Sequence, residues 1–389
     1  MKILFVTYHM PFPHVAGSMQ RTALLIDALR RNHQVDIFLL RGRGQAEFLA
    51  DNGYHVAGFS PLPEFPLWKK ALDRMFKHIE YEYRSNHRIF SALKQVFDGG
   101  GYDLVIGRYL KASEVAGVSS LAPSLIDLDD LDTSVLANRL SSPGTPRWQR
   151  PLVRWKLRQL QVEFDKWVNR YTRCWVSSEN DLALLKRDGV DVVPNIAWQM
   201  DPRPPYQPSP DTKQLLWVGS FNHPVNLAGL NRFIEQCWPA IHQAEPTAEL
   251  CVVGSSLPKT HHKKWSRIPG INVLGFVENL DRHYMESTCS IVPLWDGAGT
   301  KIKVIESLSY GRTALVTAHS ARGYENTLKH NESLWVANNE QDLIEGALLL
   351  LNGRDLRHML EKNGRSIVEQ LHNMSAFQRQ VDASIARFQ

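Results

Sequence analysis

Short apolar runs alternate with longer segments of helical periodicity along the first half of the chain. The apolar runs are rich in β-branched and aromatic residues, and the segments between them, such as MQRTALLIDALRR, repeat their apolar positions at helical spacing. The runs occupy residues 3–8, 34–40, 103–107, 124–127 and 173–178. This alternation is typical of a parallel sheet covered by helices.

The same alternation restarts after a proline-rich stretch. Residues 192–213 carry several prolines and no apolar periodicity, which predicts a linker. Further apolar runs follow at residues 214–220, 248–254, 271–276, 289–294, 313–317 and 333–337. We therefore predict an α/β protein with two doubly wound, Rossmann-like domains that face a central cleft, where ligands of such sheets bind.

The predicted domain boundaries follow these changes of pattern. The N-terminal domain is expected at residues 1–195, a linker at 196–212 and the C-terminal domain at 213–372. The amphipathic segment 373–389 is expected to form a helix that packs back toward the first domain.

Composition narrows the class of protein. A chain of 389 residues is long enough for two domains of roughly 150–200 residues each. The net charge of +5 is mild and basic residues interleave with acidic ones, which argues against a nucleic-acid partner. No apolar run approaches the roughly 18 residues that span a bilayer, so we expect a cytoplasmic protein. The four cysteines are far apart in apolar segments, which predicts core packing rather than disulfides or zinc.

Two common nucleotide motifs are missing. No G-x-G-x-x-G follows the first strand, where the loop HMPFPHVAGSMQR has a single glycine, Gly17. The P-loop pattern with Gly-Lys-Ser/Thr is also absent. The first absence counts against a dehydrogenase and the second against an ordinary ATPase.

A glycine loop in the second half predicts a phosphate site. The segment DGAGTKIKVIESLSYGRTALV, residues 296–316, is interpreted as a loop after a strand, then a helix and another strand. Gly297 and Gly299 allow a phosphate to approach the backbone, and amides at a helix start favour an anion. Lys301 and Lys303 add positive charge, so a pyrophosphate is the expected occupant.

Glu306 extends this site to a nucleotide. It lies on an apolar strip of the predicted helix, where an isolated carboxylate would be costly without a polar partner. A ribose diol would satisfy both of its oxygens. A turn, a solvated lysine pair and a surface glutamate would explain each residue separately. Together, at a strand end, they favour a nucleoside diphosphate.

At these residues the chain resembles glycosyltransferases of the GT-B fold, in particular the family 4 group, also called group 1. The family's strand, G-x-G-T loop and helix with a ribose-binding glutamate match the segment above. WVGSFNHPVNLAGLNRFIEQCWP (217–239) is similar to the family's first strand and helix of the second domain, and VLGFVENLDRHY (273–284) to the turn that receives the nucleobase. The resemblance covers nearly all of the chain. It implies donor-binding roles for Gly17, Ser220, Asn222, Phe276, Val277, Gly297, Gly299, Thr300, Lys301, Lys303 and Glu306.

The chain departs from the family pattern at two places. Many retaining members have a glutamate, eight positions before the ribose glutamate, that contacts the donor sugar, and this chain has Ala298 there. The arginine and lysine that often follow the first strand of the second domain are replaced by SFNHPVN. Phosphate binding would then depend on Lys301, Lys303 and the helix start.

An acidic segment follows the apolar run at 124–127. Asp127, Asp129, Asp130 and Asp132 are expected at the carboxyl end of a strand, facing the cleft. Asp127 and Asp130 are our candidate catalytic residues, to orient or deprotonate an acceptor hydroxyl or to contact the donor sugar. A helix cap with an acidic first turn explains the same pattern, and both interpretations stay open. No metal and no other cofactor is expected.

Three further features have alternative interpretations. His14, near Gly17, is a candidate donor or acceptor contact, although most loop histidines have no chemical role. Residues 66–90 and 146–161 mix basic and aromatic residues at helical spacing. Such helices can lie on an anionic membrane surface or pack their aromatic side on the sheet. Packing is favoured for 146–161, and both alternatives stay open for 66–90.

The predicted function is transfer of a sugar from a nucleotide-diphospho-sugar to a glycan, a lipid-linked or another hydroxyl acceptor. The resemblance implies a role in cell-surface polysaccharide or glycoconjugate synthesis, a retaining outcome, and peripheral contact at the inner face of the membrane. Two alternatives remain: a nucleotide-sugar 2-epimerase on the same fold, and a non-catalytic partner that binds a nucleotide-sugar or glycan.

Overall fold

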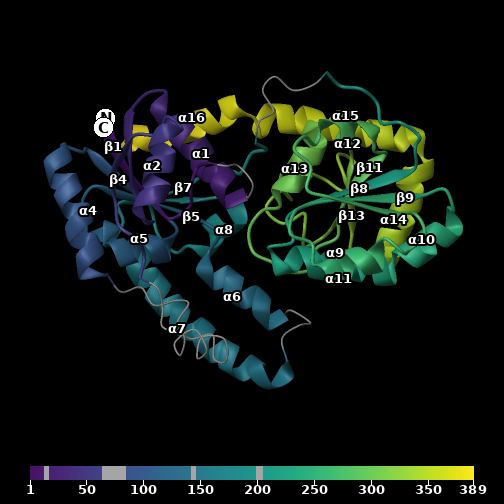
Figure 1. The fold of residues 1–389 in the computed structure, drawn as a ribbon, viewed down its shortest axis with the longest axis horizontal. Coiled ribbons are helices and arrows are strands. Elements are labelled where there is room, and N and C mark those ends of the chain that lie inside the picture. The colour runs from purple at the N-terminus through teal and green to yellow at the C-terminus, as the bar shows by residue number, and fades with distance from the viewer. Residues whose placement is uncertain (13–16, 64–84, 142–145, 199–204) are drawn as a thin grey trace. The chain divides into compact units, whose positions relative to one another are not determined.

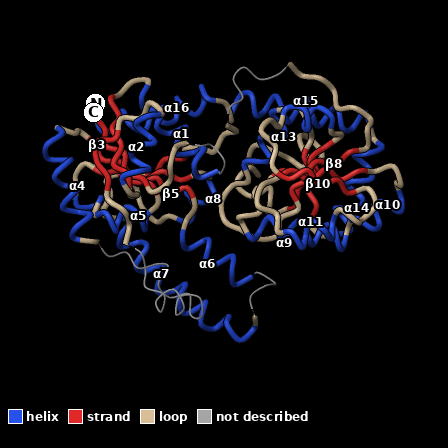
Figure 2. Tube along the Cα trace, in the orientation of Figure 1, coloured by secondary structure: helices blue, strands red, loops and turns tan. Residues whose placement is uncertain are grey.

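The computed structural model describes residues 1–12, 17–63, 85–141, 146–198 and 205–389. His14 and most of the 66–90 segment lie outside these residues. The chain forms two compact units. Unit 1 comprises Met1–Pro194 with Phe377–Gln389, and unit 2 comprises Asn195–Ala376. In each unit a parallel sheet lies between layers of helices (Figure 1 and Figure 2), so the predicted fold class, α/β with two doubly wound sheets, is confirmed.

Unit 1 is built on a seven-stranded parallel sheet. The strand order is β3-β2-β1-β4-β5-β6-β7. The strands are β1 (Lys2–Thr7), β2 (Gln34–Leu39), β3 (Val56–Phe59), β4 (Leu104–Arg108), β5 (Ser124–Asp129), β6 (Arg173–Val176) and β7 (Val190–Val192). The helices are α1 (Gly17–Arg30), α2 (Arg43–Asp51), α4 (His87–Gly100), α5 (Leu110–Ala116), α6 (Asp132–Ser141), α7 (Arg150–Val168), α8 (Glu179–Leu184) and most of α16 (Met374–Ile385).

The two faces of this sheet are covered by different helices. Buried side chains of α4, α5 and α7 share one apolar cluster with residues of β1, β4 and β5. Helix α16 lies beside α1, because Gln378 donates to the Ala28 carbonyl at 2.9 Å. Trp175 of β6 donates to Ser384 of α16 at 2.8 Å. The last helix of the chain is therefore part of the core of unit 1.

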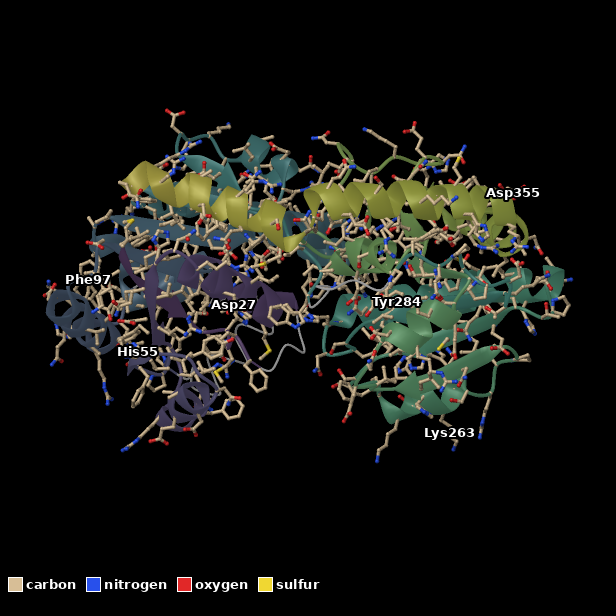
Figure 3. All side chains as sticks on the ribbon, turned by 90° about the horizontal axis from the view of Figure 1, so that it is seen from above. Asp27, His55, Phe97, Lys263, Tyr284 and Asp355 are labelled. Atoms are coloured by element: carbon tan, nitrogen blue, oxygen red, sulfur yellow. The ribbon has the colours of Figure 1, made fainter. Side chains whose placement is uncertain are left out.

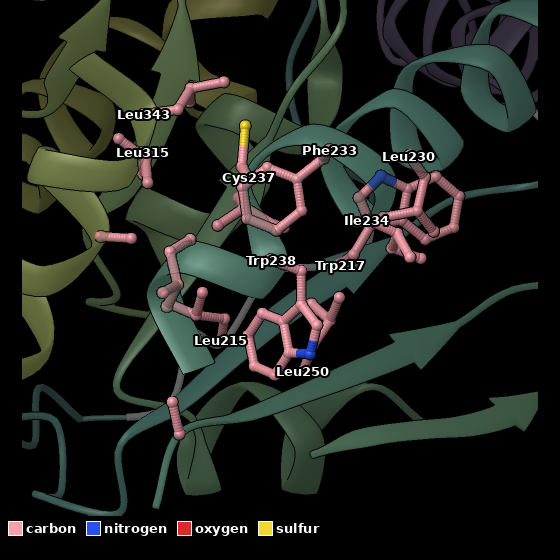
Figure 4. Close-up of a cluster of buried hydrophobic side chains, with 14 of the residues drawn as sticks. Leu215, Trp217, Leu230, Phe233, Ile234, Cys237, Trp238, Leu250, Leu315 and Leu343 are labelled. Atoms are coloured by element: carbon pink, nitrogen blue, oxygen red, sulfur yellow. The ribbon is translucent and has the colours of Figure 1, made fainter. Parts of the chain in front are cut away.

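Unit 2 has a six-stranded parallel sheet in the order β10-β9-β8-β11-β12-β13. The strands are β8 (Gln214–Val218), β9 (Glu249–Val253), β10 (Ile271–Gly275), β11 (Cys289–Val292), β12 (Ala314–Thr317) and β13 (Trp335–Ala337). The helices are α9 (Pro224–Gln236), α10 (Trp238–Ala244), α11 (Lys259–Trp265), α12 (Asp281–Glu286), α13 (Ile302–Ser309), α14 (Glu340–Asn352) and α15 (Arg354–Leu371). Leucine, phenylalanine and tryptophan side chains of α9, α10 and α14 fill one face of the sheet (Figure 4). Helices α12, α13 and α15 cover the other face.

Part of the proline-rich stretch is fixed on unit 2. Tyr206 and the backbone N–H of Ser209 both donate to Glu361 of α15, each at 3.2 Å. Arg357 donates to the Ser209 hydroxyl at 2.7 Å and also pairs with Asp211. The described end of this stretch, residues 205–212, therefore lies along α15 instead of forming an independent tether.

The aromatic side of residues 146–161 does not pack on the sheet. Trp148 is 73% exposed and Trp155 is 49% exposed. The favoured packing interpretation for this segment is therefore wrong, because other residues of α7 occupy the core position. Among the residues described, no helix combines the length and the apolar character that crossing a membrane requires.

Candidate functional site

The glycine loop of unit 2 connects β11 to α13. Gly297 has a φ of 101° and Gly299 a φ of 70°, both in the left-handed region that favours glycine. Lys301 is the residue before the first turn of α13. Asn195 donates from Nδ2 to the Thr300 hydroxyl at 2.9 Å, which fixes the end of the loop. The two glycines thus have the conformational role that only glycine fills without strain.

Lys301 braces this loop from inside. Its ammonium donates to the carbonyls of Gly297, Ala298 and Gly299 at 3.2, 2.7 and 2.8 Å. His319 Nε2 lies 2.8 Å from the Gly297 carbonyl oxygen. The Lys301 side chain is buried, so its charge acts through the loop it holds. A positive charge directly beneath the loop favours an anion above it.

The side chain of Lys303, a residue of α13, reaches the end of β8. Its ammonium donates to Asn226 Oδ1 at 3.1 Å and lies 4.8 Å from the centre of the Trp217 ring. Asn226 in turn donates to the Ser220 carbonyl at 2.7 Å. Lys303 therefore supplies a cation from α13 next to the loop after β8, where the sequence has no arginine or lysine. Burial lowers the pKa of Lys303 to about 7.

Glu306 belongs to a chain of polar contacts on the same helix. Tyr284 of α12 donates to one Glu306 carboxylate oxygen at 3.0 Å (Figure 3 labels Tyr284). The Tyr284 ring stacks on Tyr310 with centroids 4.3 Å apart, and Tyr310 donates to Asp281 at 2.6 Å. Burial raises the pKa of Glu306, while the Tyr284 hydrogen bond and nearby Lys303 oppose that rise. The Tyr284 hydroxyl thus holds one oxygen of the Glu306 carboxylate.

The residues expected at the nucleobase lie at the end of β10. The Phe276 side chain is 64% exposed, directly after Gly275 with its φ of 76°. Val277 packs against the cluster that contains Tyr284 and Tyr310. An exposed aromatic ring beside a half-buried aliphatic residue offers a flat apolar surface of the kind a base can stack on.

The carboxyl ends of β8 and β9 approach so closely that only glycine fits. Val218 pairs with Val253, and a Cβ added to Gly254 would lie 1.8 Å from the Gly219 carbonyl oxygen. Ser220 follows directly, and its hydroxyl accepts from the backbone N–H of Asn222 at 3.3 Å and from the Ser255 hydroxyl at 3.2 Å.

We expect Gly254→Ala to move the β8 end, since a backbone carbonyl cannot yield as a flexible side chain can. The free energy of unfolding should fall by about 1–3 kcal/mol, and nucleotide binding should weaken with it. Denaturant unfolding and a nucleotide titration measure the two effects. Gly44→Ala is the matched control, because its Cβ would meet nothing within 4 Å. Equal stability of the two variants would contradict the prediction.

The acidic segment of unit 1 contains a buried ion-pair cluster. Strand β5 extends to Asp129. Asp127 and Asp129 therefore lie within the last residues of the strand, and not after its end as expected. Asp127 has no exposed surface and accepts from Arg21 at 2.7 Å and from Arg108. Arg108 also donates to Asp129 at 3.0 Å. With both oxygens in guanidinium bonds, Asp127 is placed to position its neighbours.

Two residues beside this cluster have unusual backbones. Tyr109 and Asp129 have φ values of 60° and 58°, and Tyr109 donates to Asp129 at 2.8 Å. His9 lies against the Tyr109 ring with centroids 4.9 Å apart, and burial lowers the pKa of His9 to about 4. Non-glycine residues in this region store strain, which clusters at functional sites. Asp130, the next residue along the chain, is half-buried.

The sequence-predicted residues fall into two sets. The structure brings Ser220, Lys303 and the glycine loop together, since a Cβ on Gly219 would lie 2.7 Å from Lys303 Nζ. Gly17, the first residue of α1, and the two candidate aspartates belong to unit 1. Within the described ranges, no group of three or more histidine, cysteine, aspartate or glutamate side chains is arranged to hold a metal ion.

Sequence reasoning missed several residues that support the unit 2 site: Trp217, Tyr284, Tyr310 and His319. Tyr284 lies 22 positions before Glu306, and no motif or periodicity connects them. His319 lies just after the end of β12, outside every motif of the sequence analysis. Asn226 lies in the segment 217–239 that resembles the family, and its bond to Lys303 gives it a physical role.

The comparisons with known proteins agree with the fold. Residues 212–353 match the family model described as glycosyl transferases group 1. No curated protein matches the chain in sequence. Sucrose-phosphate synthase from Thermosynechococcus elongatus has a similar structure at 17% identity, with a TM-score of 0.68 over 99% of this chain and 98% of the other. HepE of Anabaena, solved with UDP and glucose, is similar at 15% identity, with a TM-score of 0.68 over 99% of both chains. WaaG, a glycosyltransferase involved in lipopolysaccharide biosynthesis, is similar at 14% identity, with a TM-score of 0.61 over 98% of this chain and 99% of WaaG.

Proposed function

We propose, from the match of residues 212–353 to the family model described as glycosyl transferases group 1, that the chain transfers a sugar from a nucleotide-diphospho-sugar to a hydroxyl acceptor. The donor binds to unit 2, and unit 1 serves the acceptor and the donor sugar. A glycan or a lipid-linked molecule is the proposed acceptor, and synthesis of a cell-surface polysaccharide or glycoconjugate at the inner face of the membrane is the proposed context. WaaG acts in lipopolysaccharide biosynthesis, which supports this context by analogy.

The observation that carries the proposal is the combination of charges around the glycine loop. Lys301 lies beneath the loop, Lys303 lies beside the end of β8, and Glu306 is one turn further along the same helix. Two cations near a helix start suit a diphosphate, and a carboxylate beyond them suits a ribose diol. Phe276 and Val277 complete the set with a surface for the base.

Catalysis follows from where charge develops. When the bond between the sugar and the diphosphate breaks, negative charge builds on the leaving phosphate. Lys303 and the loop amides over Lys301 are preorganised to stabilise that charge. Holding donor and acceptor in the right orientation lowers the activation barrier further. No metal is needed in this scheme, because the two lysines take the role of a divalent cation.

Unit 1 contributes the polar groups for the sugar and the acceptor. Asp130 is the proposed catalytic carboxylate, and Asp127 orients the segment that carries it through Arg21 and Arg108. A retaining outcome is proposed from the family resemblance. Ala298 provides no carboxylate to the donor sugar, so the proposed recognition of the sugar depends on other polar groups.

The first test is a thermal-shift screen against UDP, GDP, ADP, dTDP and CMP. UDP has priority because HepE was solved with it. We expect one diphosphate to raise the unfolding temperature, since a ligand that binds the folded state stabilises it by mass action. No shift with any nucleotide would remove the main physical support for the proposal.

Glu306→Ala should weaken that binding by about tenfold to a hundredfold, because a hydrogen bond to a charged group contributes about 1.5–3 kcal/mol. Isothermal titration of the selected diphosphate measures the loss. Glu345→Ala on α14, which removes an exposed carboxylate outside the site, should leave the affinity unchanged. Equal affinity of Glu306→Ala and the parent protein would exclude the ribose role.

Release of nucleoside diphosphate from the donor separates the three candidate functions. A transferase releases it in proportion to acceptor. An epimerase that hydrolyses the donor releases it without acceptor, because water takes the acceptor's place. A non-catalytic binding partner, which Ala298 makes a specific alternative, binds the donor and releases nothing.

A further inference from the structure

Two reciprocal hydrogen bonds between tyrosines and carboxylates join helices α12 and α13. Tyr284 of α12 donates to Glu306 of α13 at 3.0 Å. Tyr310, the residue that follows α13, donates back to Asp281 of α12 at 2.6 Å. The two tyrosine rings stack between these bonds, with centroids 4.3 Å apart and ring planes 13° apart. We call these four residues the tyrosine bridge.

The rings of the tyrosine bridge are buried against the sheet of unit 2. Tyr284 is 1% exposed, and it shares an apolar cluster with Tyr310, Leu216 of β8 and Val253 of β9. Arg312, itself buried, donates to the backbone carbonyl oxygen of Tyr284 at 2.8 Å. A buried side chain that is closely packed on several sides has few alternative rotamers. The Tyr284 hydroxyl is therefore held in one position.

The tyrosine bridge engages one oxygen of the Glu306 carboxylate. Tyr284 donates to Oε2, and Oε1 accepts no hydrogen bond from any residue that the structure describes. The Glu306 side chain is half-buried, and a carboxylate that is partly removed from water requires further donors for its lone pairs. Because Oε2 is anchored, the carboxylate group has a defined orientation in which a ligand hydroxyl can donate to it.

The tyrosine bridge is also tied to the turn that is expected to meet the nucleobase. This turn, residues 276–280, contains Phe276 and Val277. Asp281 donates from its backbone N–H to Asn279 Oδ1 of the turn at 2.6 Å, and its carboxylate accepts from Tyr310. The base turn and the carboxylate expected at the ribose are therefore connected through the same pair of stacked rings.

We propose that Tyr284 is a positioning residue that directs the Glu306 carboxylate toward the 2′- and 3′-hydroxyls of a ribose, and so makes the site prefer ribonucleotides to 2′-deoxyribonucleotides. Tyr284 is buried and acts only through Glu306, while Tyr310 keeps the Tyr284 ring in place. The inference rests on the proposed donor site, because it assigns Glu306 to the ribose. Without the Tyr284 hydroxyl the carboxylate is free to rotate, and nucleotide binding must order it again.

The test compares matched ribonucleoside and 2′-deoxyribonucleoside diphosphates by isothermal titration of the full chain. UDP is paired with dUDP, GDP with dGDP and ADP with dADP. The parent protein should bind the ribonucleotide of its preferred base about tenfold more tightly, because the deoxynucleotide lacks one hydrogen bond to a charged group. Tyr284→Phe keeps the ring and removes the hydroxyl, and should lower this ratio by about threefold to tenfold. A smaller folded fraction would weaken both nucleotides equally and leave the ratio unchanged.

A double-mutant cycle determines whether Tyr284 acts through Glu306. In a Glu306→Ala background, Tyr284→Phe should change the affinity for the same ribonucleotide by less than about twofold, because no carboxylate remains to be positioned. Tyr206→Phe is the matched control, since it removes a tyrosine hydroxyl that donates to Glu361 of α15 in the same unit. This variant should keep the ratio of the parent protein.

The outcomes separate this inference from the proposed function. If the parent protein binds none of the nucleoside diphosphates, the proposed donor site is wrong and the inference falls with it. If it binds them, an unchanged ratio in Tyr284→Phe overturns the positioning role alone. The same conclusion follows if Tyr284→Phe weakens binding as much in the Glu306→Ala background as in the parent protein, or if Tyr206→Phe lowers the ratio equally. A parent protein that binds both members of a pair equally well also overturns it.

Discussion

Asp127→Ala is expected to lower the free energy of unfolding of unit 1 by about 3–5 kcal/mol. Asp127 has no exposed surface and pairs with Arg21 and Arg108, which are themselves buried. Removing the carboxylate leaves two buried guanidinium groups to share the carboxylate of Asp129, and an incompletely compensated buried charge is costly. Denaturant unfolding followed by circular dichroism measures the loss.

Two further variants make this result interpretable. Asp188→Ala removes an exposed aspartate of the same unit and should change stability by less than about 0.5 kcal/mol. Asp130→Asn should fold normally and lose turnover by about a hundredfold, as expected for a general base. A stable Asp127→Ala protein would show that the ion-pair cluster does not hold this end of the sheet.

Donor binding should weaken by about tenfold for each pH unit above 7, reaching about a hundredfold at pH 9. Burial lowers the pKa of Lys303 to about 7, so its ammonium loses its proton just above neutral pH in the free protein. A diphosphate beside it raises that pKa, because the opposite charge favours the charged form. The complex therefore takes up a proton that the free protein lacks, and binding falls as protons become scarce.

Isothermal titration at several pH values, in two buffers of different ionisation enthalpy, detects this proton uptake. A nucleotide-diphospho-sugar is the right ligand, because it has no phosphate monoester to titrate near pH 6. Lys303→Arg keeps its charge over the whole range, so its affinity should not vary with pH. A flat profile for the parent protein between pH 7 and 9 would contradict the assignment of Lys303 to the phosphates.

The parallel sheets were predictable because their central strands are buried on both faces. Such strands read as continuous apolar runs, as in β1 and β8. The strands that were not predicted are β3 and β7, at the two edges of the unit 1 sheet. Their residues are only partly buried, so VAGF and VDV lack the apolar run that marks an interior strand.

The donor loop was predictable in position but not in its internal contacts. The sequence places Lys301 beside two glycines. From it we predicted that the lysine's charge points toward the ligand. The ammonium instead turns back to three loop carbonyls, which depends on the left-handed backbone at Gly297 and Gly299. Trp148, in the turn before α7, and Trp155 of α7 show the same limit. Their spacing places them on one side of a helix, but it does not say which side faces the core.

The packing of α16 has a consequence for how the protein is made. Phe377 and Val381 are completely buried in unit 1, and Ser384 accepts from Trp175. The ribosome completes the whole of unit 2 before it releases these residues. Unit 1 therefore emerges before its α16 residues are made, and the apolar surface that Phe377 and Val381 cover stays exposed while unit 2 is synthesised. Exposed apolar surface makes a nascent chain prone to aggregation, and a chaperone that covers this surface would act on the first unit rather than the second.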